Sequence, residues 1–142
     1  MQDQQKLQQM LNEINAYKEQ SEIIQQEIAN IQQTIAEVRT LESTIDDIKT
    51  KDSFEALVPV GAGSFMNAEI KNEDKIIMSV GSGVAISKTY DEAKETAEFQ
   101  KKQLEDSLDK LYKNLQQITD IVAQLSPQAE QLMMKLQQAG QY

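Results

Sequence analysis

The middle of the chain, residues 56–88, reads ALVPVGAGSFMNAEIKNEDKIIMSVGSGVAISK and differs in kind from the sequence on either side. It holds four of the five glycines, one of the two prolines and many β-branched residues. Turn-forming residues divide it into four apolar runs that are typical of strands, at 57–60, 64–70, 75–80 and 84–88. The pattern Val-Gly-X-Gly occurs at 60–63 and again at 80–83, so we expect two successive β-hairpins with similar turns.

The apolar residues of these strands do not fall on one face. Met66, Ala68 and Ile70 alternate on one side of their strand, whereas Phe65 points to the other side. Strands that are apolar on both faces need covering layers, and their open edges need partners. We therefore expect other subunits to add strands and close a barrel. The residues expected to drive this assembly are Val58, Val60, Phe65, Met66, Ile70, Ile76, Ile77, Met78, Val80, Val84 and Ile86.

The sequence before this segment predicts one long helix over residues 5–52. Apolar residues recur there in steps of three and four without an intervening Gly or Pro, which is the a/d pattern of a coiled coil. Gln, Glu and Asn fill most of the other positions and suit a solvated face. The expected seam is Leu7, Met10, Ile14, Tyr17, Ser21, Ile24, Ile28, Ile31, Ile35, Val38, Leu41, Ile45 and Ile48.

A second long helix is predicted over residues 89–139. Thr89 and Glu92 form a capping-box pattern at its start. The seam keeps its phase through Ser126 and Pro127, so we expect either a kink there or a restarted helix with Ser126 as its N-cap. The expected seam is Leu104, Leu108, Leu111, Leu115, Ile118, Val122, Leu125, Ala129, Leu132 and Leu136.

These segments have one economical arrangement. The predicted fold is α+β but mainly α, a long antiparallel two-helix coiled coil with two β-hairpins inserted between the helices. We expect residues 1–142 to form a single domain, with the hairpins of residues 56–88 at one end. Both chain termini would then lie together at the other end.

Composition argues against several classes of function. The chain carries 14 basic and 23 acidic residues, and such a polyanion repels nucleic acids and anionic membrane surfaces. Cys and His are absent, which removes disulfides, thiolate metal sites and the commonest general acid–base residue. We therefore expect no enzyme, no metal and no other cofactor. No apolar signal segment or membrane span is visible, so the expected location is the cytoplasm.

Three local patterns have a second interpretation. The glycines at 61–63 could be taken for a phosphate cradle, but a strand follows them and the P-loop lysine is missing, so a turn is favoured. The acidic pairs Asp46-Asp47 and Glu73-Asp74 could bind a divalent cation, although nothing matches an EF-hand and solvated acids are favoured. Lys101 falls at a seam position, where it either sets the register as a buried charge or, as we favour, extends its amine to water.

The ends of the two helices carry more apolar residues than a narrow seam uses. Leu11 lies one step off the first seam, and Met133 and Met134 cannot both lie in the second. Flexible, polarisable methionines are common on surfaces that bind varied partners. We expect this end to bind non-native client proteins through Leu7, Met10, Leu11, Leu132, Met133, Met134 and Leu136.

At its middle segment the chain resembles the α class of prefoldin. The resemblance rests on LVPVGAG at 57–63 and KIIMSVGSGVAI at 75–86, within a helix, two hairpins, helix order that covers essentially the whole chain. β-class subunits of that family have one hairpin, so two hairpins indicate the α class. In lacking extensions beyond these elements, the chain is similar to an archaeal subunit.

The resemblance implies a hexamer of two α-class and four β-class subunits, so the partners would be a second α subunit and β subunits. It further implies ATP-independent capture of unfolded or nascent proteins at the coiled-coil tips and their delivery to a group II chaperonin. The alternative is a structural coiled-coil spacer or tether in another assembly. That alternative explains the helices but gives no reason for the double hairpin.

Overall fold

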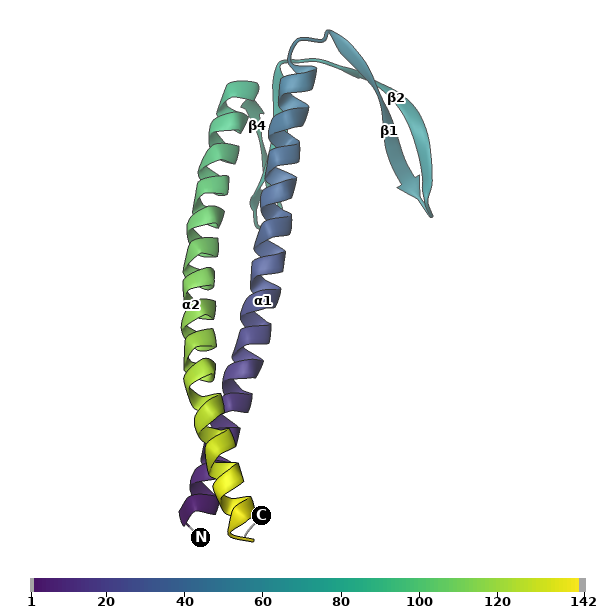
Figure 1. Cartoon of the computed structure of the whole chain (residues 1–142). Coiled ribbons are helices and arrows are strands. Elements are labelled where there is room, and N and C mark those ends of the chain that lie inside the picture. The colour runs from purple at the N-terminus through teal and green to yellow at the C-terminus, as the bar shows by residue number, and fades with distance from the viewer. Residues whose placement is uncertain (1, 141–142) are drawn as a thin grey trace. The chain divides into compact units, whose positions relative to one another are not determined.

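The computed structural model describes residues 2–140 and confirms the predicted order of elements (Figure 1). The elements are α1 (Gln2–Ile48), β1 (Ser53–Gly61), β2 (Ser64–Lys71), β3 (Lys75–Gly81), β4 (Val84–Thr89) and α2 (Tyr90–Gln138). The described residues group into two compact units. The first combines residues up to Gln33 with those from Glu105 onward, and the second is Thr34–Leu104.

In the first unit the two helices pack along the predicted seams. Every seam residue expected there is buried or half-buried. The core at the chain ends is a buried cluster of Leu7, Met10, Ile14, Ala129 and Leu136. Leu7 belongs to the start of α1 and Leu136 to the end of α2, so the helices are antiparallel and their free ends meet, as predicted.

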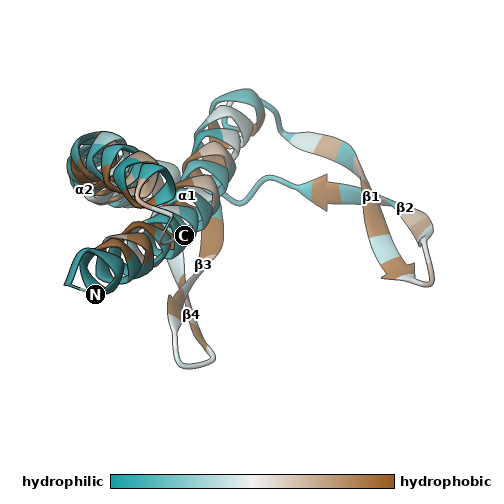
Figure 2. Cartoon of the chain, turned by 60° about the horizontal axis from the view of Figure 1, so that its bottom comes forward, coloured by the Kyte–Doolittle hydropathy of each residue, from teal (hydrophilic) through white to brown (hydrophobic). Residues whose placement is uncertain are grey.

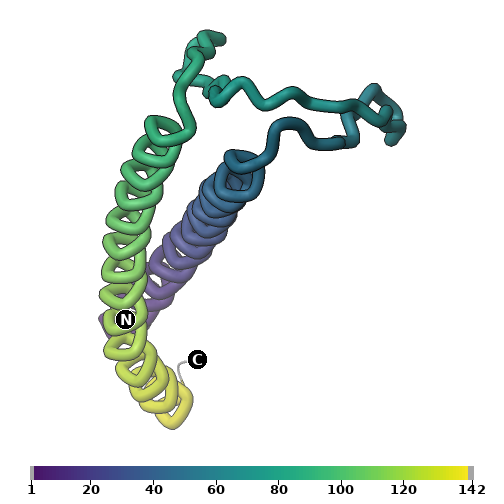
Figure 3. The backbone as a smooth tube through the Cα atoms, turned by 90° about the horizontal axis from the view of Figure 1, so that it is seen from above, coloured from purple at the N-terminus to yellow at the C-terminus, as the bar shows by residue number. Residues whose placement is uncertain are grey.

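Proline 127 lies inside α2, which is helical on both sides of it. The restarted helix is therefore wrong, and Ser126 is an interior helical residue and no N-cap. The seam continues through this point because Leu125 and Ala129, on either side of the proline, both pack into the helix pair. Figures 1 and 3 show the yellow end of α2 turned away from the yellow-green segment before it, which fits a kink without a break.

In the second unit small residues of α2 belong to the core. Ala93 and Ala97 of α2 are fully buried, as is Ile45 of α1, and Ile35 and Val38 of α1 are also buried. The predicted α2 seam began at Leu104 and did not include these two alanines. Alanine is a weak signal of a seam because it is common on every face of a helix.

The two hairpins repeat the same turn. Gly61 pairs with Ser64 and Gly81 with Val84, so each loop has two residues, and Ala62, Gly63, Ser82 and Gly83 all have positive φ. Positive φ at both loop positions defines a type I′ turn, which matches the twist of the flanking strands. A register shift between Pro59 and Gly61, and between Ser79 and Gly81, inserts one extra residue before each turn. The glycines at 61–63 are thus a hairpin turn, as favoured.

The element bounds differ from the prediction at both junctions with the hairpins. The first helix ends at Ile48 rather than 52, and β1 starts at Ser53, so the hairpins span 53–89 rather than 56–88. The earlier strand start follows from pairing, since Ser53 lies opposite Lys71. Thr89 is the N-cap of α2, because its Oγ1 accepts a 3.2 Å hydrogen bond from the Glu92 backbone N–H.

Asn72 ties these junctions together. Its side-chain amide donates to the Ile48 carbonyl at 3.2 Å and to the Lys51 carbonyl at 2.6 Å, and these bonds satisfy the end of α1. Its Oδ1 accepts from the Tyr90 hydroxyl at 2.7 Å and from the Asp74 backbone N–H at 2.8 Å. One side chain therefore joins the end of α1, the β2–β3 turn and the start of α2.

Candidate functional sites

The hairpins carry the largest group of exposed apolar side chains in the described chain. Figure 2 shows hydrophobic residues along all four strands. Nine of the eleven residues expected to drive assembly are exposed, from Ile70 at 39% to Ile77 at 75%; Ile76 and Met78 are half-buried. A monomer that leaves such strands uncovered presents a surface for other chains.

The register shows which residues share a face of the first hairpin. Val58 lies opposite Met66 and Phe54 opposite Ile70, which gives one continuous apolar face. The other face is apolar near the turn, where Pro59 lies opposite Phe65, and polar near the helices. Leu57, 65% exposed, belongs to this second face and was omitted from the sequence-based set, although its position between Ala56 and Val58 in an apolar run was a usable signal.

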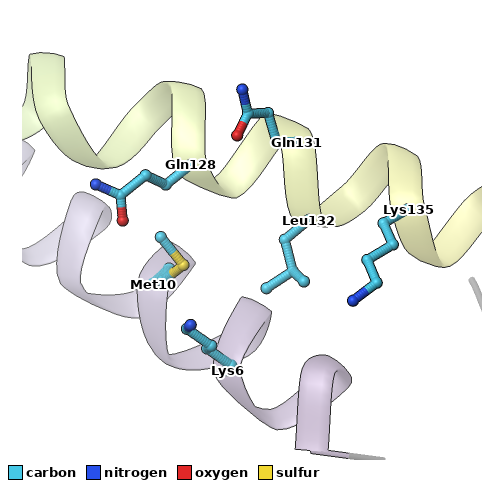
Figure 4. A pocket seen from close by; sticks show the side chains of 6 residues that line it. All are labelled: Lys6, Met10, Gln128, Gln131, Leu132 and Lys135. Carbon is cyan, nitrogen blue, oxygen red and sulfur yellow. The ribbon is translucent and has the colours of Figure 1, made fainter.

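The second site is an open groove between the helix ends of the first unit, with a volume of about 300 Å³ (Figure 4). Met10 and Leu132 supply its apolar surface. The side chains of Leu132 and Lys135 extend from α2 toward α1, and Lys6 stands on the α1 side. The glutamines at positions 128 and 131 complete the lining, so none of the described residues that line the groove is acidic.

The seven residues expected at this end have different environments. Leu7, Met10 and Leu136 are buried in the cluster that joins the helices, although part of Met10 still lines the groove. Leu11, Leu132 and Met133 are partly buried against that cluster. Met134 is 59% exposed, so one of the two adjacent methionines lies off the seam, as the sequence requires.

A network of charged residues joins the helices in the second unit. The Lys101 Nζ contacts Glu98 Oε1 and Glu42 Oε1, each at 3.0 Å. About two turns nearer the start of α2, the Lys94 Nζ contacts Asp46 Oδ1 at 2.6 Å. Lys101 is thus neither unpaired in the core nor extended into water, since its side chain is 20% exposed and bridges the two helices. The hydrogen bonds that Lys101 donates to the carboxylates of Glu98 and Glu42 raise the pKa of Lys101 above its ordinary value.

Asp46 and Asp47 also form ion pairs with lysines. The hydrogen bond with Lys94, and after it the one with Lys49, lowers the pKa of Asp46. Asp47 contacts Lys51 at 3.4 Å. Both acids thus lie on the exposed surface, as favoured, and each also pairs with a lysine.

Two exposed apolar residues on the helices, here called the shaft, were not predicted as a surface feature. Ile23 is 61% and Phe99 62% exposed. Neither residue falls on a predicted seam position, and this off-seam placement was the signal that could have predicted their exposure. In the part of the chain that the structure describes, neither helix has an apolar stretch long enough to cross a membrane.

Comparison with known proteins agrees with this architecture. The family model described as Prefoldin subunit matches residues 17–138. A prefoldin subunit alpha of Methanobrevibacter smithii is 57% identical over 132 residues, which cover 93% of this chain and 90% of that protein. The corresponding subunit of Methanosphaera stadtmanae is 40% identical over 94% of this chain and 96% of its own length.

A solved structure extends the likeness to the fold. A chain in the cryo-EM structure of filamentous PFD from Methanocaldococcus jannaschii aligns with a TM-score of 0.54 and 28% identity, and the alignment covers 87% of this chain and 98% of that one. The two long helices, the double hairpin and relatives of the alpha class at this identity lead to one conclusion. The chain belongs to the prefoldin family of chaperones, as an archaeal-type alpha-class subunit that forms hetero-oligomers with beta subunits.

Proposed function

We propose that this subunit captures non-native proteins at the distal ends of its helices without ATP and passes them to a group II chaperonin. In this proposal the hairpins join a second α subunit and four β-class subunits, in the cytoplasm, and the distal ends stay free. The observation that carries the proposal is the groove that Met10 and Leu132 line in part, where the two helix ends of the first unit meet, together with the exposed side chain of Met134, two residues after Leu132.

The burial of Leu7 and Leu136 assigns them a supporting part in this proposal. These two side chains close the helix pair and hold the groove residues in place. Leu11, Leu132, Met133 and Met134 then offer a small apolar patch, which is weak by itself. Several ends that engage one unfolded chain would raise the affinity by roughly two to four orders of magnitude in a favourable geometry.

The test compares two exposed apolar residues that differ in position. Met134→Gln changes a side chain that is 59% exposed at the distal end, and Ile23→Gln changes one that is 61% exposed on the shaft. We expect the first to raise the chaperone concentration needed to suppress aggregation of a denatured protein by roughly two- to five-fold, because avidity multiplies a small loss at each end. We expect the second to leave that concentration unchanged.

A stronger variant removes residues 1–10 and 132–142 from the assembled complex; the part of this deletion beyond residue 140 lies outside the described residues. Holding activity should fall sharply while native mass spectrometry shows the mass of a complex of shortened subunits. Unchanged holding by both this variant and Met134→Gln would place client binding elsewhere. A tether would show no suppression with any variant.

A further inference from the structure

The distal groove combines an apolar floor with positive charge in a chain of formal net charge −9. Lys6 and Lys135 flank Met10 and Leu132, and the remaining lining residues are neutral amides. A cation beside an apolar surface favours a ligand in which a carboxylate lies next to an apolar side chain. The groove has a volume of about 300 Å³, which is at the small end of ligand sites, so it suits a short segment of chain rather than a folded domain.

A second observation shows that this place accepts a carboxylate. The Asp3 Oδ2 lies 3.3 Å from the Lys135 Nζ, across the two helix ends. Both side chains are well exposed, at 41% for Asp3 and 71% for Lys135, so this pair is weak and can exchange its partner. Asp3 thus occupies a position that a carboxylate of a bound chain could take.

We propose that the groove selects extended client segments in which apolar residues alternate with aspartate or glutamate. The inference rests on the proposed function, because it names the class of client segment that the distal end takes. The apolar side chain packs on Met10 and Leu132, and the neighbouring carboxylates pair with Lys6 and with Lys135, displacing Asp3.

Two labelled peptides test the selectivity on the assembled complex. One has the central sequence Leu-Glu-Leu-Glu-Leu and the other Leu-Gln-Leu-Gln-Leu, both with fluorescein and the same Gly-Ser flanks. Fluorescence anisotropy at low ionic strength should give an affinity about five-fold higher for the glutamate peptide, since two exposed ion pairs contribute modestly. The preference should shrink in high salt.

Matched variants assign the preference to the groove. In the double variant Lys6→Gln/Lys135→Gln the two peptides should bind equally, whereas Lys110→Gln/Lys113→Gln, which removes the same charge from exposed positions on the shaft, should keep the preference. Asp3→Asn should tighten binding of the glutamate peptide about two-fold, because Lys135 loses its internal partner.

Equal binding of the two peptides by the unchanged complex overturns the selectivity, as does a preference that survives Lys6→Gln/Lys135→Gln. Binding of neither peptide overturns it as well. The proposed function is judged separately by aggregation suppression with Met134→Gln. A complex that depends on Met134 for holding but does not distinguish the peptides would keep the function and lose this inference.

Discussion

The helices and the hairpins of this chain use apolar residues in opposite ways. Along the helices every predicted seam residue finds cover within the chain, and Ile45, Leu7 and Leu136 are almost completely buried. On the hairpins, apolar residues such as Ile77 remain mostly exposed. The coiled coil therefore completes its core with its own two helices, whereas the hairpins leave their apolar residues exposed, as the proposed assembly through them requires. We propose that this difference separates the residues that fold the subunit from those that assemble it.

The largest expected effect is the loss of the complex when the hairpins are altered. Ile77→Asp with Val80→Asp would place unpaired charges in the proposed interface of the hairpins, which costs several kcal/mol per buried ion. We expect association with β-class partners to weaken at least about 100-fold, and sedimentation should show loss of the complex. The helical circular dichroism of the subunit should persist.

Ile23→Asp is the matched control, because Ile23 is 61% exposed on α1 and Val80 is 55% exposed on a hairpin. It should leave the complex intact. A full-size complex of the double variant would show that these strands do not drive assembly.

A smaller effect is expected on the stability of the helix pair. Ile45 is 0% exposed, so Ile45→Ala should lower the free energy of unfolding of the helices by about 2–4 kcal/mol, through lost burial and the cavity left behind. Urea unfolding of the assembled complex, followed by the helical signal, should show the change. Ile23→Ala, the same substitution at an exposed position, should stay within about 0.5 kcal/mol. Equal effects of the two would contradict the division between covered and uncovered residues.

The smallest effect concerns the ion pairs that flank the covered core. Asp46→Asn should lower Tm by about 1–2 °C near neutral pH, while Asp109→Asn, an exposed acid with the same change of charge, should leave it unaltered. The lowered pKa of Asp46 means that its contribution is present above the ordinary value near 3.8 and is lost as pH falls through the folded value.

The pKa shift of Lys94 has the opposite sign to that of Asp46. The hydrogen bond with Asp46 raises its pKa, so its contribution is present below the ordinary value near 10.5 and is lost as pH rises through the folded value. Thermal melts of the original chain and Asp46→Asn should therefore differ between about pH 4 and 10.5 and converge outside this range. A difference in Tm that persists at pH 2 would show that the pair is not its source.

Most of the fold could be predicted because it rests on periodic signals. Steps of three and four placed both seams, and the repeated Val-Gly-X-Gly placed both hairpin turns. Asn72 could not be recognised, since its hydrogen bonds reach Ile48, 24 residues earlier, and Tyr90, 18 residues later. The position of Asn72 in the sequence indicated only that it lies in a turn between two strands.

The distal site was predicted in part. The surplus of apolar residues at both helix ends indicated the place, but periodicity does not say which of Leu132, Met133 and Met134 is covered. The groove lysines were missed for a physical reason. Lys6 and Lys135 come together only once the helices are paired, and each alone reads as an ordinary solvated residue.

The antiparallel pairing also sets an order in which the helices can close. Contacts between them join residues 48 apart at Lys94 and Asp46, 59 apart at Lys101 and Glu42, and 80 apart at Tyr112 and Gln32. Closing the long loops first would cost more entropy, so pairing is expected to zip from the hairpins toward the chain ends. During synthesis α1 emerges with its seam uncovered and stays so until α2 follows it from the ribosome. A subunit of a chaperone family thus passes through a stage in which it is itself a nascent chain with exposed apolar surface.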